Sequence, residues 1–228
     1  MGSNYTLNYN VDIVYCIDAT ASMQPILDTV KNNAINFYDD FKKTMNKKQK
    51  PIGKLRIRVV AFRDYYYDGD EAMLVTDFFE MPGQADDLKA CLNSIVADGG
   101  GDDPEDGLEG LAYSMKSNWC KDSGKKRHVI VVYSDDATHD LGFGKSVPNY
   151  PQGMPRDFDE LTRWWGNAAN PGVMDNSAKR LLLFTPDKPS WNTIRETWNN
   201  CIHYESDAGN GLEEVDYEQI LSAICNSI

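Results

Sequence analysis

The sequence predicts an α/β fold: a doubly wound, mostly parallel six-stranded sheet with helices on both faces. Short β-branched apolar segments alternate with amphipathic segments along the whole chain, which is the pattern of βαβ units. The 228 residues are 41% hydrophobic, which is enough for one sizeable core. No change of composition marks a linker. We therefore expect a single domain over residues 1–228, with its core between residues 11 and 225.

The strands are expected where apolar and β-branched residues are concentrated. Val11–Ile17 is almost continuously apolar, as strands buried on both faces of a parallel sheet are. Leu55–Phe62 alternates between apolar and polar residues, which is typical of a half-buried strand. In chain order, the six expected strands are Val11–Ile17, Leu55–Phe62, Val75–Glu80, His128–Tyr133, Leu181–Phe184 and Cys201–Tyr204.

The helices are expected where apolar residues recur at near-helical spacing. One long helix is predicted from Ile26 to Met45 on that basis. Pro104 fits the first turn of a later helix, whose positive end Glu105 and Asp106 complement. A long surface loop, rich in Gly and Pro, is expected at 140–156. The other expected helices are Asp86–Val96, Pro104–Met115, Asp157–Asn167, Ser190–Trp198 and Val215–Ile224.

The charge of the chain limits its partners. The formal net charge is -12 and the pI is about 4.6. Dense basic stretches occur only at Lys42–Lys50 and Lys125–Arg127, which we expect at a solvated helix end and at the start of a strand. A nucleic-acid-binding protein usually carries a basic patch, so we expect no nucleic-acid partner. No stretch approaches the ~18 consecutive apolar residues of a membrane span.

The cysteines indicate a reducing environment. There are five of them, at irregular spacing and without a CxxC pair. The odd number argues against a disulfide framework, and the spacing argues against zinc. The first ten residues also lack the apolar segment of a signal peptide. We expect reduced thiols and a cytoplasmic location.

Three loops of unusual polarity follow the ends of expected strands. They are Asp18–Ser22 (DATAS), Gly101–Glu105 (GDDPE) and Ser134–His139 (SDDATH). Right-handed crossovers bring the carboxyl ends of parallel strands to one edge of a sheet, where ligands bind in such folds. Carboxylate and hydroxyl oxygens suit Mg²⁺, Mn²⁺ or Ca²⁺ better than zinc or copper. The sequence therefore predicts a divalent cation site at this edge.

The D-x-T-x-S motif at Asp18, Thr20 and Ser22 resembles the metal-ion-dependent adhesion site (MIDAS) of von Willebrand factor A (VWA) domains, whose usual form is D-x-S-x-S. The resemblance implies a VWA fold and two further ligands. The second-loop ligand corresponds to Asp102 by helix register, and the third-loop ligand corresponds to Asp135. It also implies that Thr20 and Ser22 bind the cation directly, with one or more Asp side chains acting through water.

Further segments resemble a subgroup of these domains. GGGDDPED, the FRD at 62–64, DDATH, and NYPQGMPRDFDEL from Asn149 are similar to VWA domains that accompany α-kinases and occur in bacterial and eukaryotic signalling proteins. The resemblance spans residues 11 to about 224. It implies a non-catalytic module that binds a protein partner, such as a kinase or phosphatase, in a bacterial signalling, stress or conflict system.

Three carboxylates around one dication would change the character of such a site. With Asp18, Asp102 and Asp135 as ligands, we predict that the site binds its cation tightly without a carboxylate from a partner. Mg²⁺ is the expected cation, with Mn²⁺ and Ca²⁺ as alternatives. The expected candidates for the rim of the site are Asp64, Asp103, Asp136 and His139, although His139 also fits a solvated loop.

Other interpretations stay open. Asp18, Thr20 and Ser22 could cap the following helix, and the acidic residues from 102 to 106 could complement a helix dipole. D-x-T-x-S also resembles the motif of haloacid dehalogenase-type phosphohydrolases, in which Asp18 would be the nucleophile. That family expects Thr or Ser after its second strand, where this sequence has Ala61-Phe62-Arg63. The chain has no GxSxG, Walker or HExxH motif, so the sequence favours a non-catalytic domain.

Overall fold

The computed structural model describes residues 8–101, 104–122 and 124–228. Its strands are β1 (Tyr9–Asp18), β2 (Ile52–Phe62), β3 (Met73–Val75), β4 (Phe79–Met81), β5 (Lys125–Tyr133), β6 (Lys179–Pro186) and β7 (Cys201–Ser206). Its α-helices are α1 (Gln24–Asn33), α2 (Phe37–Lys47), α3 (Ala85–Ser94), α4 (Gly107–Met115), α5 (Phe158–Trp165), α6 (Pro189–Thr197) and α7 (Tyr217–Ser227). Short 3-10 helices are η1 (Ala21–Met23), η2 (Gly69–Glu71) and η3 (Phe143–Ser146).

The strands form one sheet in the order β3-β2-β1-β5-β6-β7, with β4 also paired to β2. β1, β2, β5, β6 and β7 are parallel, so the predicted mostly parallel α/β sheet is confirmed. The expected strand Val75–Glu80 is instead two short strands, β3 and β4, both antiparallel to β2. The sheet therefore has seven strands and not six. Thr76 causes the interruption, because its hydroxyl accepts the amide proton of Val59 at 3.0 Å, in place of a backbone carbonyl.

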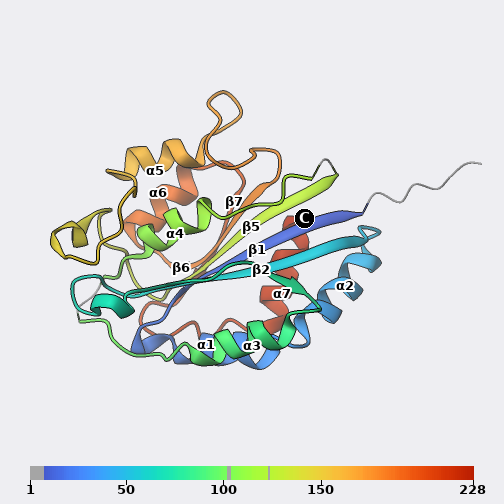
Figure 1. Cartoon of the computed structure of the whole chain (residues 1–228), viewed down its shortest axis with the longest axis horizontal. Helices are drawn as coiled ribbons and strands as arrows, with labels where there is room; N and C mark the ends of the chain where they lie inside the picture. The colour runs from blue at the N-terminus through green and yellow to red at the C-terminus, as the bar shows by residue number, and fades with distance from the viewer. Residues whose placement is uncertain (1–7, 102–103, 123) are drawn as a thin grey trace, which may run out of the picture.

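Helices cover both faces of the sheet (Figure 1). α1, α2, α3 and α7 pack on one face, and α4, α5 and α6 pack on the other. β1 lies in the middle and supplies side chains to both layers in alternation: Ile13 and Tyr15 face one core, and Val14 and Cys16 face the other. Burial on both faces explains why this strand is continuously apolar.

The predicted long helix from Ile26 to Met45 is wrong, because it is two helices. A turn at 34–36 separates α1 from α2 and leaves Ile35 44% exposed. Two consecutive asparagines, Asn32 and Asn33, precede the turn, and Asn is a poor helix former. The break lets Phe37 and Met45 of α2 reach the core on a new axis.

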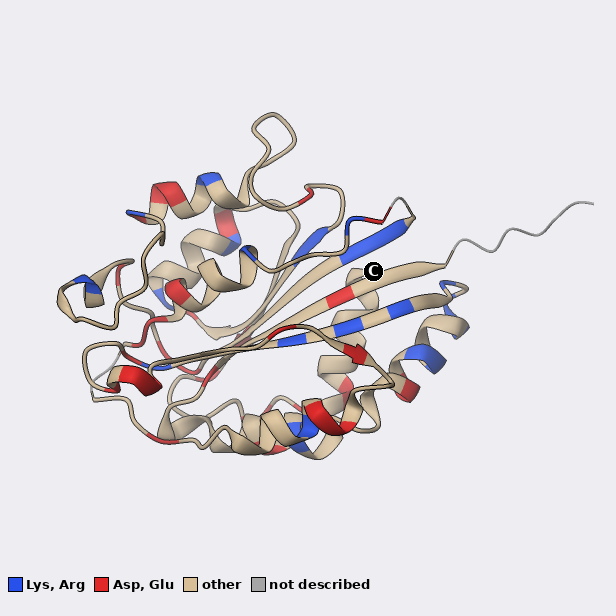
Figure 2. Cartoon of the chain, in the orientation of Figure 1, with Lys and Arg blue, Asp and Glu red and all other residues tan. Residues whose placement is uncertain are grey.

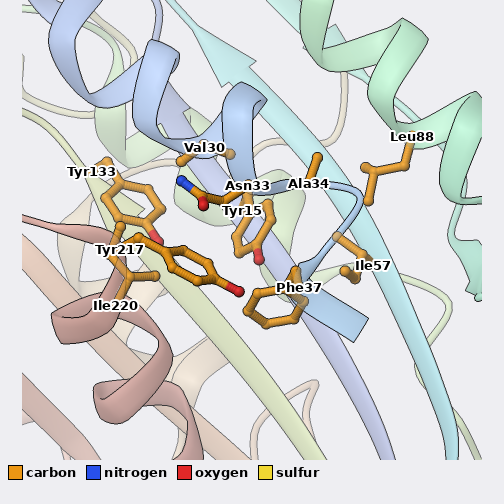
Figure 3. Close-up of a pocket in the computed structure, with 10 residues that line it drawn as sticks. All are labelled: Tyr15, Val30, Asn33, Ala34, Phe37, Ile57, Leu88, Tyr133, Tyr217 and Ile220. Carbon is orange, nitrogen blue, oxygen red and sulfur yellow. The ribbon is translucent and has the colours of Figure 1, made fainter. Parts of the chain in front are cut away.

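A small apolar pocket lies between the sheet and helices α1, α2 and α7 (Figure 3). Its free volume is about 10 Å³, roughly the room that one water molecule needs. Tyr15, Tyr133 and Tyr217 line it from β1, β5 and α7. The Tyr217 hydroxyl donates to Asp40 at 3.0 Å. The Tyr133 hydroxyl is buried and has no hydrogen-bond partner among the described residues.

Charge is distributed unevenly along the strands. The basic stretch Lys125–Arg127 begins β5, and Lys42–Lys47 falls in the second half of α2, as expected. Figure 2 shows Lys and Arg on the amino-terminal parts of β2 and β5, whereas carboxylates gather at the opposite ends of the strands. The five cysteines are free thiols. Within the described ranges, no helix is long and apolar enough to cross a membrane.

Candidate metal centre

Asp18 is the last residue of β1 and lies at the centre of the carboxyl edge of the sheet. Its backbone pairs with Phe62 of β2, and the neighbouring Ile17 pairs with Tyr133 of β5. The side chain is fully buried. One carboxylate oxygen accepts hydrogen bonds from the Thr20 amide at 3.0 Å and from the Thr20 hydroxyl at 2.6 Å. The other accepts from the Ser134 hydroxyl at 3.0 Å.

Ser22 and Asp135 join the first predicted loop to the third. The Ser22 hydroxyl donates to Asp135 Oδ1 at 3.1 Å, and the Gly211 amide donates to Asp135 Oδ2 at 2.8 Å. The Gly209 amide also donates to the backbone carbonyl of Asp135, at 2.8 Å. Three segments far apart in the sequence therefore meet at this edge. Two predicted ligands, Asp18 and Asp135, lie in the same cluster as the two predicted hydroxyls.

The alternative role of this loop as a helix cap is wrong. Thr20 is the N-cap residue of η1, and Met23 is the N-cap residue of α1. Neither residue makes a side-chain capping hydrogen bond. The Thr20 hydroxyl instead donates to Asp18.

Glu105 is the residue that sequence reasoning missed. It was expected in the first turn of a helix, but α4 begins at Gly107, and Glu105 forms an isolated β-bridge with Thr138. Its side chain is only 3% exposed, and Oε2 has no hydrogen-bond partner among the described residues. A Cβ built on Gly100 would lie 2.7 Å from Glu105 Oε1 and 3.1 Å from Thr20 Cγ2. The Glu105 carboxylate therefore lies beside the Thr20 loop.

The electrostatics of these carboxyl groups reflect burial without a cation. Burial and the neighbouring Asp18, Asp64 and Asp68 raise the pKa of Glu105 to about 9. Burial raises the pKa of Asp18 to about 6, against the lowering effect of its hydrogen bonds from Thr20. Both shifts mean that negative charge is costly here unless a cation neutralises it.

Asp64 and His139, expected at the rim, form a buried pair behind the candidate site. His139 Nε2 lies 2.9 Å from Asp64 Oδ2. Asp64 Oδ1 accepts from the amides of Tyr66 and Tyr67. The His139 ring stacks on Phe143 with 3.9 Å between ring centroids. The pair therefore positions an exposed aromatic patch formed by Tyr66, Tyr67 and Phe143.

Asp136 faces away from the cluster. Its side chain accepts from the Ala137 amide at 2.6 Å and lies 3.4 Å from Lys188. Its backbone carbonyl accepts from the Trp191 indole at 2.9 Å. The remaining predicted residues, Asp102 and Asp103, lie outside the described residues.

Two further buried carboxylates support the surrounding loops. Asp106 accepts from the Tyr65 amide at 2.8 Å, and burial and Glu109 raise its pKa to about 7. Glu109 accepts from the Gly142 amide at 2.7 Å and from the Tyr150 hydroxyl at 2.8 Å, which ties the 140–156 loop to α4. Burial raises the pKa of Glu109.

Arg63 holds the loops together at the carboxyl edge of the sheet. It follows β2, where the phosphohydrolase interpretation would need a Thr or Ser. Among the described residues, its guanidinium donates only to backbone carbonyls, which are those of Ala19 (3.1 Å), Glu71 (2.6 Å), Val96 (2.7 Å) and Asp98 (2.8 Å). The positive charge of Arg63 is therefore directed at carbonyl dipoles.

The donor chemistry of the cluster suits a hard cation. Thr20 and Ser22 each donate their single hydroxyl proton to a carboxylate, and neither oxygen accepts a hydrogen bond from a described residue. All nearby side-chain ligands are oxygens, which Mg²⁺, Mn²⁺ and Ca²⁺ prefer. Within the part of the chain that the structure describes, no three His, Cys, Asp or Glu side chains lie in a metal-binding arrangement. A site here therefore depends on the two hydroxyls.

No protein-family model matches the chain. A curated relative is alpha-protein kinase vwkA of Dictyostelium discoideum, which is 23% identical over 145 residues. The match covers 64% of this chain and 21% of the kinase, so the chain spans about a fifth of that protein. This weak similarity supports the α-kinase-associated resemblance.

Solved structures show the same fold at low sequence identity. The PilB minor pilin from Streptococcus sanguinis matches with a TM-score of 0.54 and 12% identity, over 99% of this chain and 62% of the pilin. The pilus adhesin SpaC from Lactobacillus rhamnosus GG, in its open conformation, matches with a TM-score of 0.53 and 14% identity. That match covers 96% of this chain and 30% of SpaC. At these identities the likeness concerns the fold alone.

Proposed function

We propose that this chain is a VWA-type interaction domain that holds one divalent cation at Thr20, Ser22 and Glu105, with Asp18 and Asp135 acting through water, and binds a protein partner through it. The observation that carries the proposal is the buried Glu105 carboxylate, which lies beside the Thr20 loop and whose Oε2 has no hydrogen-bond partner among the described residues. An unpaired buried carboxylate costs several kcal/mol unless a cation or proton neutralises it.

Each residue has a definite part in this proposal. The hydroxyls of Thr20 and Ser22 offer lone pairs to the cation while their protons stay on Asp18 and Asp135. Glu105 is the second-loop carboxylate that we propose as a ligand, because it is buried beside the Thr20 loop. Asp102 stays a prediction. The bound cation would supply a Lewis-acidic position for a carboxylate or another oxygen of the partner.

The weak similarity to an α-kinase supports an interaction role for this chain. We extend this to a partner that is a kinase or phosphatase of the same system. The bacterial signalling setting and the cytoplasmic location stay predictions from the sequence. Mg²⁺ is our first choice of cation, since the ligand types alone do not separate it from Mn²⁺ and Ca²⁺.

Cation titration of the EDTA-stripped protein tests the site directly. We expect one Mn²⁺ per chain by electron paramagnetic resonance and one Mg²⁺ by calorimetry, both tighter than millimolar. Ser22→Ala and Thr20→Val should each weaken binding by about tenfold or more, because each removes a ligand oxygen. Ser94→Ala is the matched control, since that hydroxyl lies on α3 and donates to the carbonyl of Cys91. Equal cation affinity in Ser22→Ala and Ser94→Ala contradicts the proposal. So does a dissociation constant of the wild type that is millimolar or weaker.

Two further arms separate the cation from its role. Acetate, as a carboxylate probe, should displace water from the Mn²⁺-loaded protein and lower its proton relaxation enhancement. Absence of any acetate effect would leave a cation site without the partner chemistry proposed for it, and so contradict that part. Turnover of p-nitrophenyl phosphate with Mg²⁺, abolished in Asp18→Asn, would instead establish the phosphohydrolase alternative.

A further inference from the structure

β7 forms the outer edge of the sheet, away from the candidate metal centre. Among the described strands it pairs with β6 alone, in parallel register with Leu181 opposite Cys201. The Leu181 amide donates to the carbonyl of Asn200 at 2.9 Å. In a parallel pair, alternate residues direct both backbone groups to the neighbouring strand. The backbone amide and carbonyl groups of Ile202, and of every second residue after it, therefore point toward β6. The backbone groups of Cys201, His203 and Glu205 face outward.

These outward backbone groups are available for pairing. The hydrogen bonds among the described residues give no partner to the amide or carbonyl of Cys201, His203 or Glu205. An edge strand with unpaired amides and carbonyls is a template for a further strand. The edge of β7 can accept a short extended segment along its six residues.

A long cleft runs beside this edge. It has a volume of about 760 Å³ and lies between β6, β7 and the outer side of α7. Phe184 and Tyr204 form its apolar part, with rings stacked at 4.8 Å. Ser206, on the same face of β7 as Tyr204, is 8% exposed and has a hydroxyl without a partner among the described residues. The cleft therefore offers an aromatic surface and a nearby unsatisfied hydroxyl beside the open strand edge.

The charge of the cleft indicates what fits it. Among the described residues, no Lys or Arg lines the cleft. The four acidic residues that line it are Glu205, Glu214, Asp216 and Glu218. Pairing of β7 with a second copy of itself would place these carboxylates near one another, and like charges disfavour that. A basic segment would instead meet complementary charge.

We infer that the β7 edge and its cleft bind an extended segment of a partner protein that carries Lys or Arg at alternate positions. The segment adds a strand to the sheet through its backbone, and its basic side chains enter the acidic cleft beside α7. This binding does not use the cation. It gives the domain a second contact surface, separate from the carboxyl edge of the sheet.

A labelled hexapeptide with the sequence Lys-Val-Lys-Val-Lys-Val is the probe, measured by fluorescence anisotropy with the full chain. We expect saturable binding that EDTA leaves unchanged. The same peptide with N-methylated valines should lose binding, because it cannot complete the backbone pairing. The acidic peptide Glu-Val-Glu-Val-Glu-Val should not bind. Hydrogen exchange of the wild type should show new protection at the amides of Cys201, His203 and Glu205.

Charge reversal locates the cleft. Glu205→Lys with Glu218→Lys should weaken binding by about fivefold or more, the effect of two exposed charge pairs. Asp77→Lys with Asp87→Lys is the matched control, with one exposed loop carboxylate and one in the first turn of α3. The inference is overturned if the methylated peptide binds with equal affinity, or if both double variants lose affinity equally. It is also overturned if the new hydrogen-exchange protection appears elsewhere than at β7, or if a concentration-dependent dimer is protected at β7. Loss of cation binding with peptide binding intact would refute only the proposed function.

Discussion

Glu105 provides the sharpest test of the electrostatics at the carboxyl edge. Its carboxyl group ionises near pH 4.5 in the unfolded chain and near pH 9 in the cation-free fold. At pH 7 the fold therefore holds a proton that the unfolded chain has lost, and this costs about 3 kcal/mol of stability. Glu105→Gln removes that cost because the amide is neutral. We expect the variant to be more stable than the wild type by about 2–3 kcal/mol in EDTA at pH 7.

The sign of this effect depends on pH and on the cation. The raised pKa means that the contribution of protonated Glu105 to the free energy of unfolding is fully present below pH 4.5. This contribution is lost as the pH rises toward 9. The advantage of Glu105→Gln should therefore vanish near pH 4.5 and grow with pH. Saturating Mg²⁺ should stabilise the wild type more than the variant.

Urea denaturation at several pH values, with EDTA or Mg²⁺, measures these differences. Glu71→Gln, an exposed carboxylate on η2, is the control and should change nothing. A Glu105→Gln variant that is less stable than the wild type in EDTA at pH 7, or an advantage independent of pH, would refute the reasoning.

Three further outcomes follow from buried polar groups. Arg63→Lys should lower the free energy of unfolding by about 2–3 kcal/mol and speed hydrogen exchange in the loops that Arg63 joins, since one ammonium cannot reach four carbonyls. Arg163→Lys, on the exposed side of α5, is the control. Tyr133→Phe should stabilise the protein by about 1 kcal/mol in urea denaturation, because its buried hydroxyl has no partner. Tyr217→Phe should instead be destabilising, and the reverse order would show that Tyr133 is hydrogen-bonded in solution. Burial lowers the pKa of Lys179 to about 8, so the free energy of unfolding should rise as the pH increases from 8 to 10.5. Lys179→Met should lack this rise.

The fold could be predicted because its determinants are local and repetitive. β1 is apolar on both sides, and the apolar spacing of α3 and α7 marks one face each, so the alternation of elements was visible. The meeting of Asp18 with the 134–135 segment followed from the rule that parallel strands end at one edge. The short strands β3 and β4 were not separable, because a side-chain hydrogen bond of Thr76 breaks them and composition does not show it.

The parts of the site that were not predicted depend on long-range contacts. Glu105 had the residue type and position of a helix first turn, and only its bridge to Thr138 moves it out of the helix. Arg63 was noted as part of a motif, but four carbonyl acceptors from separate loops cannot be inferred from one sequence. Asp64 was expected at a rim and is buried, because its acceptors serve the tyrosine loop and His139.

The balance of charge at this edge favours a cation as part of the fold. Six carboxyl side chains are buried there, namely those of Asp18, Asp64, Glu105, Asp106, Glu109 and Asp135. Of these, only Asp64 has an ion-pair partner among the described residues, and that partner is His139. Among the described residues, Arg63 at this edge donates to backbone carbonyls. Protonation removes the charge of Glu105 at neutral pH, but Oε2 still has no hydrogen-bond partner among the described residues. One dication beside Asp18 and Glu105 would stabilise both ionised forms at once, which no residue of the described chain does.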